Sequence, residues 1–168
     1  MKKIFAAALA AALALLGSVS ALAFDHQAMF EGMDTDYYTR FQGQDISINV
    51  YNWGEYISNG EDDSLDVNAA FEELTGIKVN YTFYATNEEL YAKLRAGGSN
   101  YDVIIPSDYM VARMGEEGLL MELDYSKIPN AENIDPRYLN PAYDTEQKYS
   151  LPYMWGTTGI IYNTTMVD

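Results

Sequence analysis

Residues 46–51, Ile46-Ser47-Ile48-Asn49-Val50-Tyr51, are the first of three strand-like stretches that decide the fold. Apolar and polar side chains alternate here and β-branched residues are frequent, which is typical of a β-strand. A helix is expected from about Leu65 to Leu74, on the spacing of its apolar residues. Ser64 is the expected N-cap of this helix, and Gly76 is expected to stop it.

The next strand-like stretch is residues 77–83, which alternate in the same way. Thr86 and Glu89 follow with the spacing of a capping box, so a second helix should begin there. The pair Gly97-Gly98 is expected to end it.

The third stretch is residues 101–106, a short and nearly continuous apolar run. Such a run predicts a strand that is buried on both faces. Ser107 is expected to cap a third helix that extends through Glu117 and stops at Gly118. Three alternations of strand and helix predict an α/β fold with a parallel sheet.

The C-terminal part of the sequence is less regular. Residues 125–148 are rich in Pro and Asn, which predicts loops. Residues 150–163 regain an apolar pattern and are interpreted as one or two strands.

The N-terminus predicts export. Lys2 and Lys3 precede an uncharged stretch from Ile4 to about Leu16, and small residues follow up to Ala23. This order is that of a signal peptide spanning residues 1–23; an uncleaved membrane anchor is the alternative. Residues 24–44 are polar and acidic without a helix or strand period, and are interpreted as an acidic tether.

Composition limits the classes of partner. The chain has no Cys, and 25 acidic against 10 basic residues give a formal net charge of -15. Nucleic acid and anionic membranes are therefore poor partners, whereas cationic ligands would be attracted. The absence of Cys also argues against a lipid-anchored form, so a free periplasmic protein is expected.

Candidate binding residues follow from the sheet prediction, because ligands of parallel sheets bind beyond the carboxyl ends of the strands. An aromatic face beside a carboxylate suits an organic ammonium group. An extended polyamine would stack its methylenes on rings and place its nitrogens at carboxylates and hydroxyls. Trp53 and Tyr56 could instead be ordinary core or lid residues. The turns after the first and third strands contain Trp53, Glu55, Tyr56, Ser107, Asp108 and Tyr109.

Two other classes of function receive little support. The single His26 cannot supply a Ser/His/Asp set, and the sequence has neither a Cys nucleophile nor a Gly-rich phosphate loop. Enzymatic activity is therefore not expected. The acidic run at residues 61–66 lacks the Gly and Glu positions of an EF-hand loop and is interpreted as a solvated turn.

Four blocks of the sequence carry distinctive motifs: residues 51–56, 71–79, 101–109 and 152–159. The first contains Tyr-Asn-Trp-x-x-Tyr and the third contains Pro-Ser-x-Tyr. These blocks closely resemble the spermidine/putrescine-binding periplasmic proteins, the substrate-binding subunits of polyamine ABC transporters. The pair of motifs is the most specific to that family.

This resemblance implies a type II periplasmic binding protein-like clamshell without a cofactor or metal, of which residues 45–168 would be the first lobe. The protein would be a monomer that presents a polyamine to the permease subunits of an ABC importer. By position, Trp53 and Tyr56 would belong to an aromatic box, Glu55 would meet an ammonium, and Ser107 and Tyr109 would line the wall. Gly54 replaces a hydroxyl residue often found in the family, and Asp108 is interpreted as a helix cap.

The length departs from the family, whose members are about twice as long and carry a second lobe. The sequence ends near the expected crossover into that lobe, so it resembles an N-terminal fragment, for which millimolar affinity at best is expected. A receptor of the same fold for a sugar, iron or another amine remains the alternative, because sugars also stack on aromatic rings.

Overall fold

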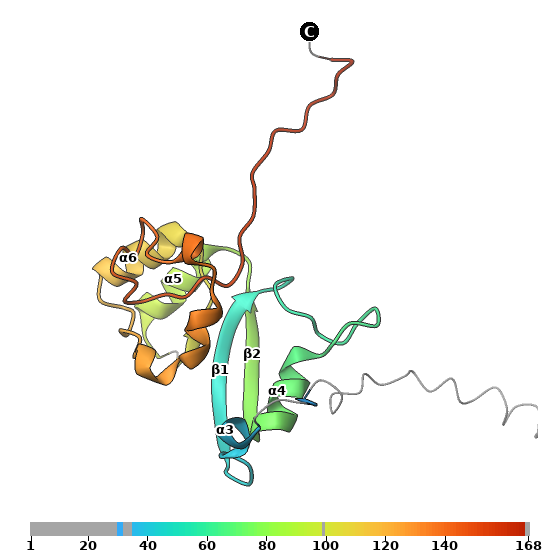
Figure 1. Cartoon of the computed structure of the whole chain (residues 1–168). Helices are drawn as coiled ribbons and strands as arrows, with labels where there is room; N and C mark the ends of the chain where they lie inside the picture. The colour runs from blue at the N-terminus through green and yellow to red at the C-terminus, as the bar shows by residue number, and fades with distance from the viewer. Residues whose placement is uncertain (1–29, 32–34, 99, 167–168) are drawn as a thin grey trace, which may run out of the picture. The chain divides into compact units, whose positions relative to one another are not determined.

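The computed structural model describes residues 30–31, 35–98 and 100–166 (Figure 1). The chain divides into two compact units. The first contains the described residues up to Ile46 and residues 57–78; the second contains residues 47–56 and the described residues from Val79 onward. The expected signal peptide lies outside the described residues. In the described part of the chain, no helix has the length and apolar character needed to cross a membrane.

The second unit is built mainly on a three-stranded sheet with the order β2-β1-β3. Its strands are β1 (Ile46–Trp53), β2 (Ile77–Tyr84) and β3 (Val103–Ile104). β1 and β3 run parallel, with Val50 opposite Val103 and Tyr51 opposite Ile104. This pairing confirms the predicted parallel α/β fold.

Helices α5 (Asn87–Ala96) and α6 (Asp108–Glu116) belong to the same unit. The capping box of α5 is confirmed: the Thr86 hydroxyl accepts the Glu89 N–H at 3.1 Å, and the Glu89 carboxylate accepts the Ala85 N–H at 3.0 Å. Gly97 then ends α5 with a positive φ of 69°. Three 3-10 helices occupy much of the predicted loop region, η1 (Tyr125–Lys127), η2 (Pro129–Asn133) and η3 (Pro136–Tyr138).

The core of the second unit combines aromatic rings with flexible apolar side chains. Tyr51 of β1 stacks on Tyr101 with ring centroids 4.5 Å apart, and its edge meets Tyr84 of β2 at 5.0 Å. This arrangement explains why Tyr51 is buried although it ends in a polar hydroxyl. The buried residues of this cluster are Tyr51, Tyr84, Leu90, Met110 and Met114.

The prediction for the third strand was wrong in one respect. Val103 is 45% exposed, so β3 is not buried on both faces. β3 contains only two residues and lies at the edge of the described sheet, with β1 as its strand neighbour there.

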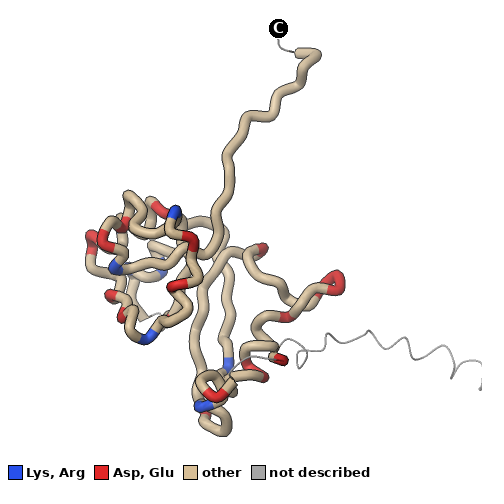
Figure 2. The backbone as a smooth tube through the Cα atoms, viewed as in Figure 1, with Lys and Arg blue, Asp and Glu red and all other residues tan. Residues whose placement is uncertain are grey.

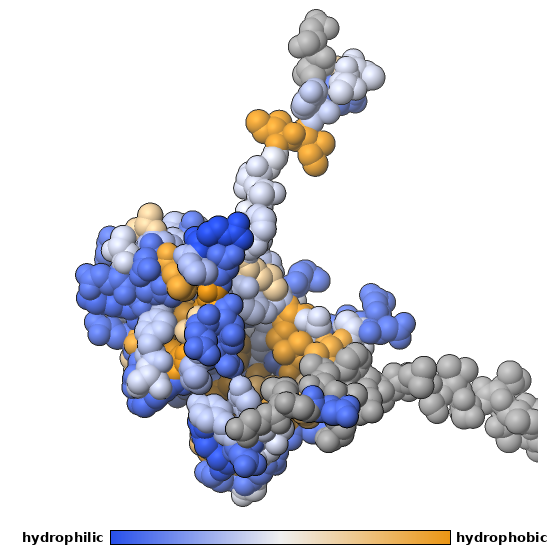
Figure 3. Space-filling view, viewed as in Figure 1, coloured by the Kyte–Doolittle hydropathy of each residue, from blue (hydrophilic) through white to orange (hydrophobic). Residues whose placement is uncertain are grey.

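The interpretation of residues 150–163 as strands was also wrong for the described structure. Residues 151–163 have no strand assignment, and Ile160 and Ile161 are 92% and 100% exposed. Figure 3 shows hydrophobic residues on this extended segment. An apolar β-branched sequence forms a strand only when a neighbouring strand accepts its backbone hydrogen bonds, and no described strand does so here.

The first unit contains α3 (Asp36–Thr39) and α4 (Val67–Thr75). α4 begins two residues later than predicted, and its N-cap is Asp66 rather than Ser64, because the Asp66 carboxylate accepts the Ala69 N–H at 2.9 Å. α3 lies within the segment interpreted as a tether, so part of that segment is folded. The amide of Gln42 donates to the carbonyls of Glu73 and Leu74 at 2.7 and 2.9 Å, which satisfies two free carbonyls at the end of α4.

Gly76, the confirmed stop of α4, provides a test of this packing. Its φ is 74°, and a Cβ there would lie 2.9 Å from the Cα of Gln42. We expect Gly76→Ala to lower the free energy of unfolding by about 2 kcal/mol, from left-handed strain plus the backbone clash. Gly43→Ala is the matched control, because Gly43 has a φ of 76° and open space around it. If urea unfolding gave the same loss of unfolding free energy for both variants, the close approach of Gly76 to the Gln42 backbone would be contradicted.

Candidate functional site

The candidate site lies within the second unit, where the three strands of the sheet end. The end of β1 and the turn after it supply Trp53 and Tyr56, and the segment from β3 into the first turn of α6 supplies Ser107 and Tyr109. The carboxyl ends of parallel strands meet at one edge of a sheet, which is where ligands of α/β proteins bind. The structure therefore groups side chains that are about 50 residues apart in the sequence.

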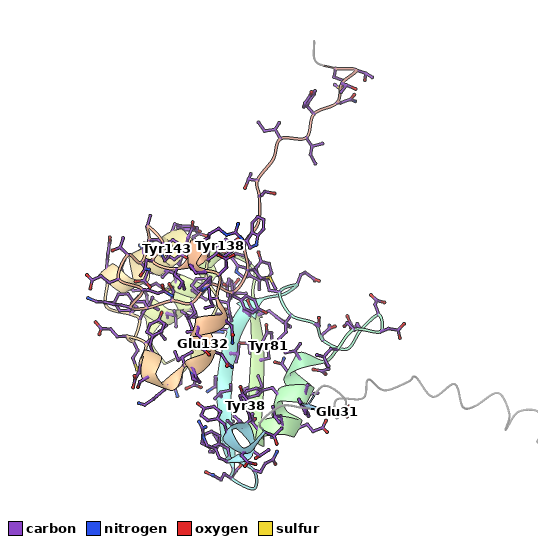
Figure 4. All side chains as sticks on the ribbon, in the orientation of Figure 1. Glu31, Tyr38, Tyr81, Glu132, Tyr138 and Tyr143 are labelled. Atoms are coloured by element: carbon purple, nitrogen blue, oxygen red, sulfur yellow. The ribbon has the colours of Figure 1, made fainter. Side chains whose placement is uncertain are left out.

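The first wall consists of Trp53 and Tyr56, whose ring centroids are 6.0 Å apart with a 36° angle between the planes. The backbone of this turn is held from two sides. The Asn52 carboxamide accepts the Trp53 N–H at 2.7 Å and donates to the Tyr81 hydroxyl at 2.6 Å; Tyr81 is labelled on β2 in Figure 4. The Tyr153 hydroxyl donates to the Tyr56 carbonyl.

The second wall consists of Ser107 and Tyr109 at the start of α6. Asn87, the first residue of α5, contacts both. Its amide nitrogen donates to the Ser107 hydroxyl and to the Tyr109 hydroxyl, each at 3.0 Å. Tyr109 in turn donates to the Glu88 carboxylate at 3.0 Å. The tyrosine is 52% exposed, so this wall is accessible to a ligand.

Tyr84 joins the two walls. Its ring lies 4.7 Å from that of Trp53, and its hydroxyl donates to the Ile105 carbonyl, two residues before Ser107. Burial raises the pKa of the Tyr84 phenol well above its ordinary value, and the neighbouring phenols of Tyr51, Tyr56 and Tyr109 raise this pKa further. A hydrogen bond with Trp53 lowers it by a smaller amount. The Tyr84 side chain is therefore a buried, neutral link between the two strand ends.

The two predicted acidic positions occupy different places. Glu55 is exposed and makes no hydrogen bond or salt bridge with any other described residue. Asp108 is the first residue of α6 rather than its cap, and its carboxylate accepts the N–H of Tyr109 at 2.7 Å. Ser107 occupies the N-cap position as predicted, but its hydroxyl accepts from Asn87 and makes no capping bond to α6.

Asn87 and Glu88 were not among the predicted site residues. Ligands of α/β proteins bind beyond strand ends, and this rule also selects the start of α5, which follows the end of β2. Asn87 and Glu88 are the first two residues of α5 and lie at that position. The capping box explained Thr86 and Glu89, and the two residues between them therefore had no assigned role.

The arrangement suits a cationic organic ligand. Exposed ring faces attract ammonium groups through the ring quadrupole, and carboxylates and hydroxyl oxygens accept their hydrogen bonds. Figure 2 shows acidic residues distributed over both units, in keeping with the net charge of -15. Among the residues that the structure describes, no three His, Asp or Glu side chains converge as metal ligands.

Comparison with known proteins extends these observations. A family model described as bacterial extracellular solute-binding protein matches residues 56–168. The chain is 44% identical over 120 residues to Spermidine/putrescine-binding periplasmic protein 1 of Haemophilus influenzae, covering 70% of this chain and 32% of that protein. It is 40% identical over 123 residues to the Putrescine-binding periplasmic protein PotF of Escherichia coli, covering 72% of this chain and 32% of PotF.

Solved structures show the same relationship. The spermidine/putrescine ABC transporter substrate-binding protein PotD from Streptococcus pneumoniae matches with a TM-score of 0.65 and 47% identity, over 73% of this chain and 36% of PotD. A putative spermidine/putrescine ABC transporter from Listeria monocytogenes matches with a TM-score of 0.63 and 44% identity, over 71% and 35% of the two chains. The chain thus spans about a third of the length of the curated relatives it matches.

Proposed function

The chain belongs to the bacterial extracellular solute-binding protein family, and from this premise we propose that it forms one wall of a polyamine receptor. The receptor would bind spermidine or putrescine outside the cytoplasm and deliver it to the permease subunits of an ABC importer. It would be a monomer, and residues 1–23 would direct its export. Binding and release without covalent chemistry would be its whole activity.

The observation that carries this proposal is the joining of two aromatic walls at one sheet edge. Trp53 and Tyr56 offer ring faces, while Tyr109 and Glu88 offer oxygen atoms. Tyr84 contacts Trp53, and its hydroxyl is bonded to Ile105, in the segment that leads from β3 to Ser107. A polyamine alternates methylenes with nitrogens, and both kinds of surface are needed to bind it. The names of the relatives support the same class of ligand.

Within this proposal each predicted residue has a role. Trp53 and Tyr56 stack on the methylenes and on one ammonium group. Glu55, which is exposed beside them, attracts the cation. Ser107 and Tyr109 accept hydrogen bonds from a nitrogen on the opposite wall, and Asp108 adds negative charge near the same hydroxyls.

Affinity for the chain alone is expected to be weak. Tyr56 and Tyr109 are 40% and 52% exposed, so a bound ammonium would keep much of its hydration. Exposed cation–π contacts contribute about 0.5–1 kcal/mol each. A dissociation constant on the order of millimolar follows for spermidine, since ordering the ligand offsets part of that gain.

The test is a titration of backbone amide resonances by NMR, which detects millimolar binding. Spermidine and putrescine should shift the amides around Trp53 and Tyr109, and glucose and ferric citrate should not. Trp53→Leu is expected to weaken spermidine binding about three- to fivefold, because it retains apolar bulk and removes the ring quadrupole.

The matched control is Trp155→Leu, since Trp155 is 70% exposed and stands outside the walls. It should bind spermidine as the unaltered chain does. A response to glucose without a response to either amine would replace the polyamine proposal with a sugar receptor of the same fold. A response to ferric citrate alone would point to an iron receptor.

A further inference from the structure

Asn87 organises the second wall through a single buried amide. Its side chain is among the buried polar groups, with 4% exposure for the residue. The amide oxygen accepts the Ser107 N–H at 3.1 Å, and the amide nitrogen donates to the hydroxyls of Ser107 and Tyr109, both at 3.0 Å. All three bonds cross from the start of α5 to the start of α6.

These bonds determine the direction of the Tyr109 hydroxyl proton. A backbone N–H can only donate, so the amide oxygen of Asn87 must face Ser107 N and its nitrogen must face the two hydroxyls. Tyr109 accepts from Asn87 and therefore directs its own proton to Glu88, because a carboxylate only accepts. Tyr109 and Glu88 are left with free lone pairs and no free proton.

We infer that Asn87 is a positioning residue that presets Tyr109 and Glu88 in this wall as hydrogen-bond acceptors, and that Glu88 is the carboxylate there that meets an ammonium group of the ligand. This inference rests on the proposed polyamine function and specifies how its site selects cations. An ammonium group only donates, so it complements such a wall. A ligand that needs donors from the protein finds none on Tyr109 or Glu88.

Glu88 differs from Glu55 in being held in place. The Tyr109 hydroxyl fixes one Glu88 oxygen, whereas Glu55 has no hydrogen-bonding partner among the described residues. A side chain that is already oriented loses less conformational entropy when it binds. Glu88 is therefore expected to contribute more to selection of the cation than Glu55.

The role of Asn87 can be tested without ligand by amide hydrogen exchange. Asn87→Ala should speed exchange of the Ser107 N–H about tenfold or more, because its side-chain acceptor is gone. The Ile105 N–H, bonded to the Tyr51 carbonyl at 3.1 Å, should keep its rate if the effect is local. Asn133→Ala is the control, since Asn133 is exposed in η2. Unchanged exchange at Ser107 would overturn the positioning role.

The role of Glu88 is tested with putrescine and 1,4-butanediol, which have the same length but differ in charge. Glu88→Gln should weaken putrescine binding about fivefold and leave the diol unaffected, while Glu116→Gln, an exposed position on α6, should change neither. Asn87→Ala and Tyr109→Phe should be non-additive toward putrescine, because the first acts through the second.

The outcomes separate the two proposals. If Glu88→Gln binds putrescine like Glu116→Gln while the unaltered chain responds to amines, the assignment of Glu88 is wrong and the polyamine function stands. If the unaltered chain responds to neither putrescine nor spermidine, the proposed function fails together with the assignment of Glu88. The exchange rate of the Ser107 N–H still decides the role of Asn87 in that case.

Discussion

Asp144→Ala is expected to lower the free energy of unfolding by about 3 kcal/mol, because several donors lose their acceptor at once. The residue is 7% exposed. Its carboxylate accepts the N–H groups of Lys148, Tyr149 and Ser150 at 2.9, 2.9 and 3.0 Å, and the Ser150 hydroxyl at 2.9 Å. Without it these groups would be left unsatisfied in a partly buried turn. Urea unfolding followed by circular dichroism measures the loss.

Asp135→Ala is the control for this prediction. Asp135 also accepts from a nearby backbone N–H, that of Arg137, and forms a salt bridge with the same residue, but the side chains of Arg137 and Asp135 are 79% and 40% exposed. Water can replace these interactions, so the loss should be clearly smaller. Similar losses for the two variants would show that the Asp144 turn is not a buried anchor.

The pH dependence of stability gives an independent check on Asp144. Burial by itself raises the pKa of this carboxyl, but the hydrogen bonds from Tyr149, Lys148 and Ser150 outweigh it, so the pKa lies below its ordinary value. A depressed pKa in the folded state contributes stability above the pKa of the unfolded chain, which is about 3.9. That contribution is lost as the pH falls through the folded-state pKa. The Asp144→Ala variant should therefore lose less stability between pH 5 and pH 2 than the unaltered chain. The difference in the slope of unfolding free energy against pH should correspond to about one titrating group.

This turn matters to the site because the chain continues from it to the first wall. Tyr125 donates to the Ser150 carbonyl at 3.3 Å, and three residues later Tyr153 donates to the Tyr56 carbonyl. A loosened Asp144 turn should therefore reduce the order of Tyr56. No feature of the sequence predicted this anchor, because residues 125–148 have no periodicity and the partners of Asp144 are backbone N–H groups.

The parallel fold was predictable because its signals are local. Alternation along β1 and β2, the Thr86 capping box and the glycine stops at Gly76 and Gly97 each act over a few residues. The errors have non-local causes. Whether Val103 is buried and whether residues 151–163 pair as strands depend on which distant segments lie beside them. The N-cap error is different: Asp66 rather than Ser64 caps α4, because only Asp66 directly precedes its first turn.

The candidate site was predictable only in part for the same reason. Motif spacing selected the ends of β1 and β3, and in the structure Trp53 and Tyr56 follow from the first and Ser107 and Tyr109 from the second. Motif spacing could not show that Asn87 bonds to both Ser107 and Tyr109, which lie 20 and 22 residues away. Nor could it show that Glu88 is the acidic residue fixed beside Tyr109. Such bonds depend on how α5 and α6 pack.

Tyr84→Ala should have the largest effect of any substitution proposed for this chain, a loss of about 4 kcal/mol in the free energy of unfolding. Tyr84 is 4% exposed, and its ring lies 5.0 Å from Tyr51 and 4.7 Å from Trp53. Removing the ring leaves a cavity in the core and breaks the bond to the Ile105 carbonyl. Because the two walls are joined through this residue, spermidine binding should be lost together with stability.

Tyr84→Phe separates the two contributions of the side chain. It retains the ring and removes only the hydroxyl that bonds to Ile105, so we expect a loss of about 1–2 kcal/mol. Phe83→Ala, at the neighbouring and 59% exposed position of β2, is the control and should cost less than about 1 kcal/mol.

Alkaline unfolding distinguishes the hydroxyl from the ring. The raised pKa of Tyr84 means that its contribution is complete below the unfolded-state pKa, about 10, and is lost as the pH rises toward the folded-state value. In Tyr84→Phe the decline of stability above pH 10 should therefore be shallower than in the unaltered chain. If Tyr84→Phe matched the unaltered chain in both stability and alkaline slope, the Tyr84 hydroxyl would not be the link between the walls, and Trp53 and Tyr109 would have to be brought together by packing alone.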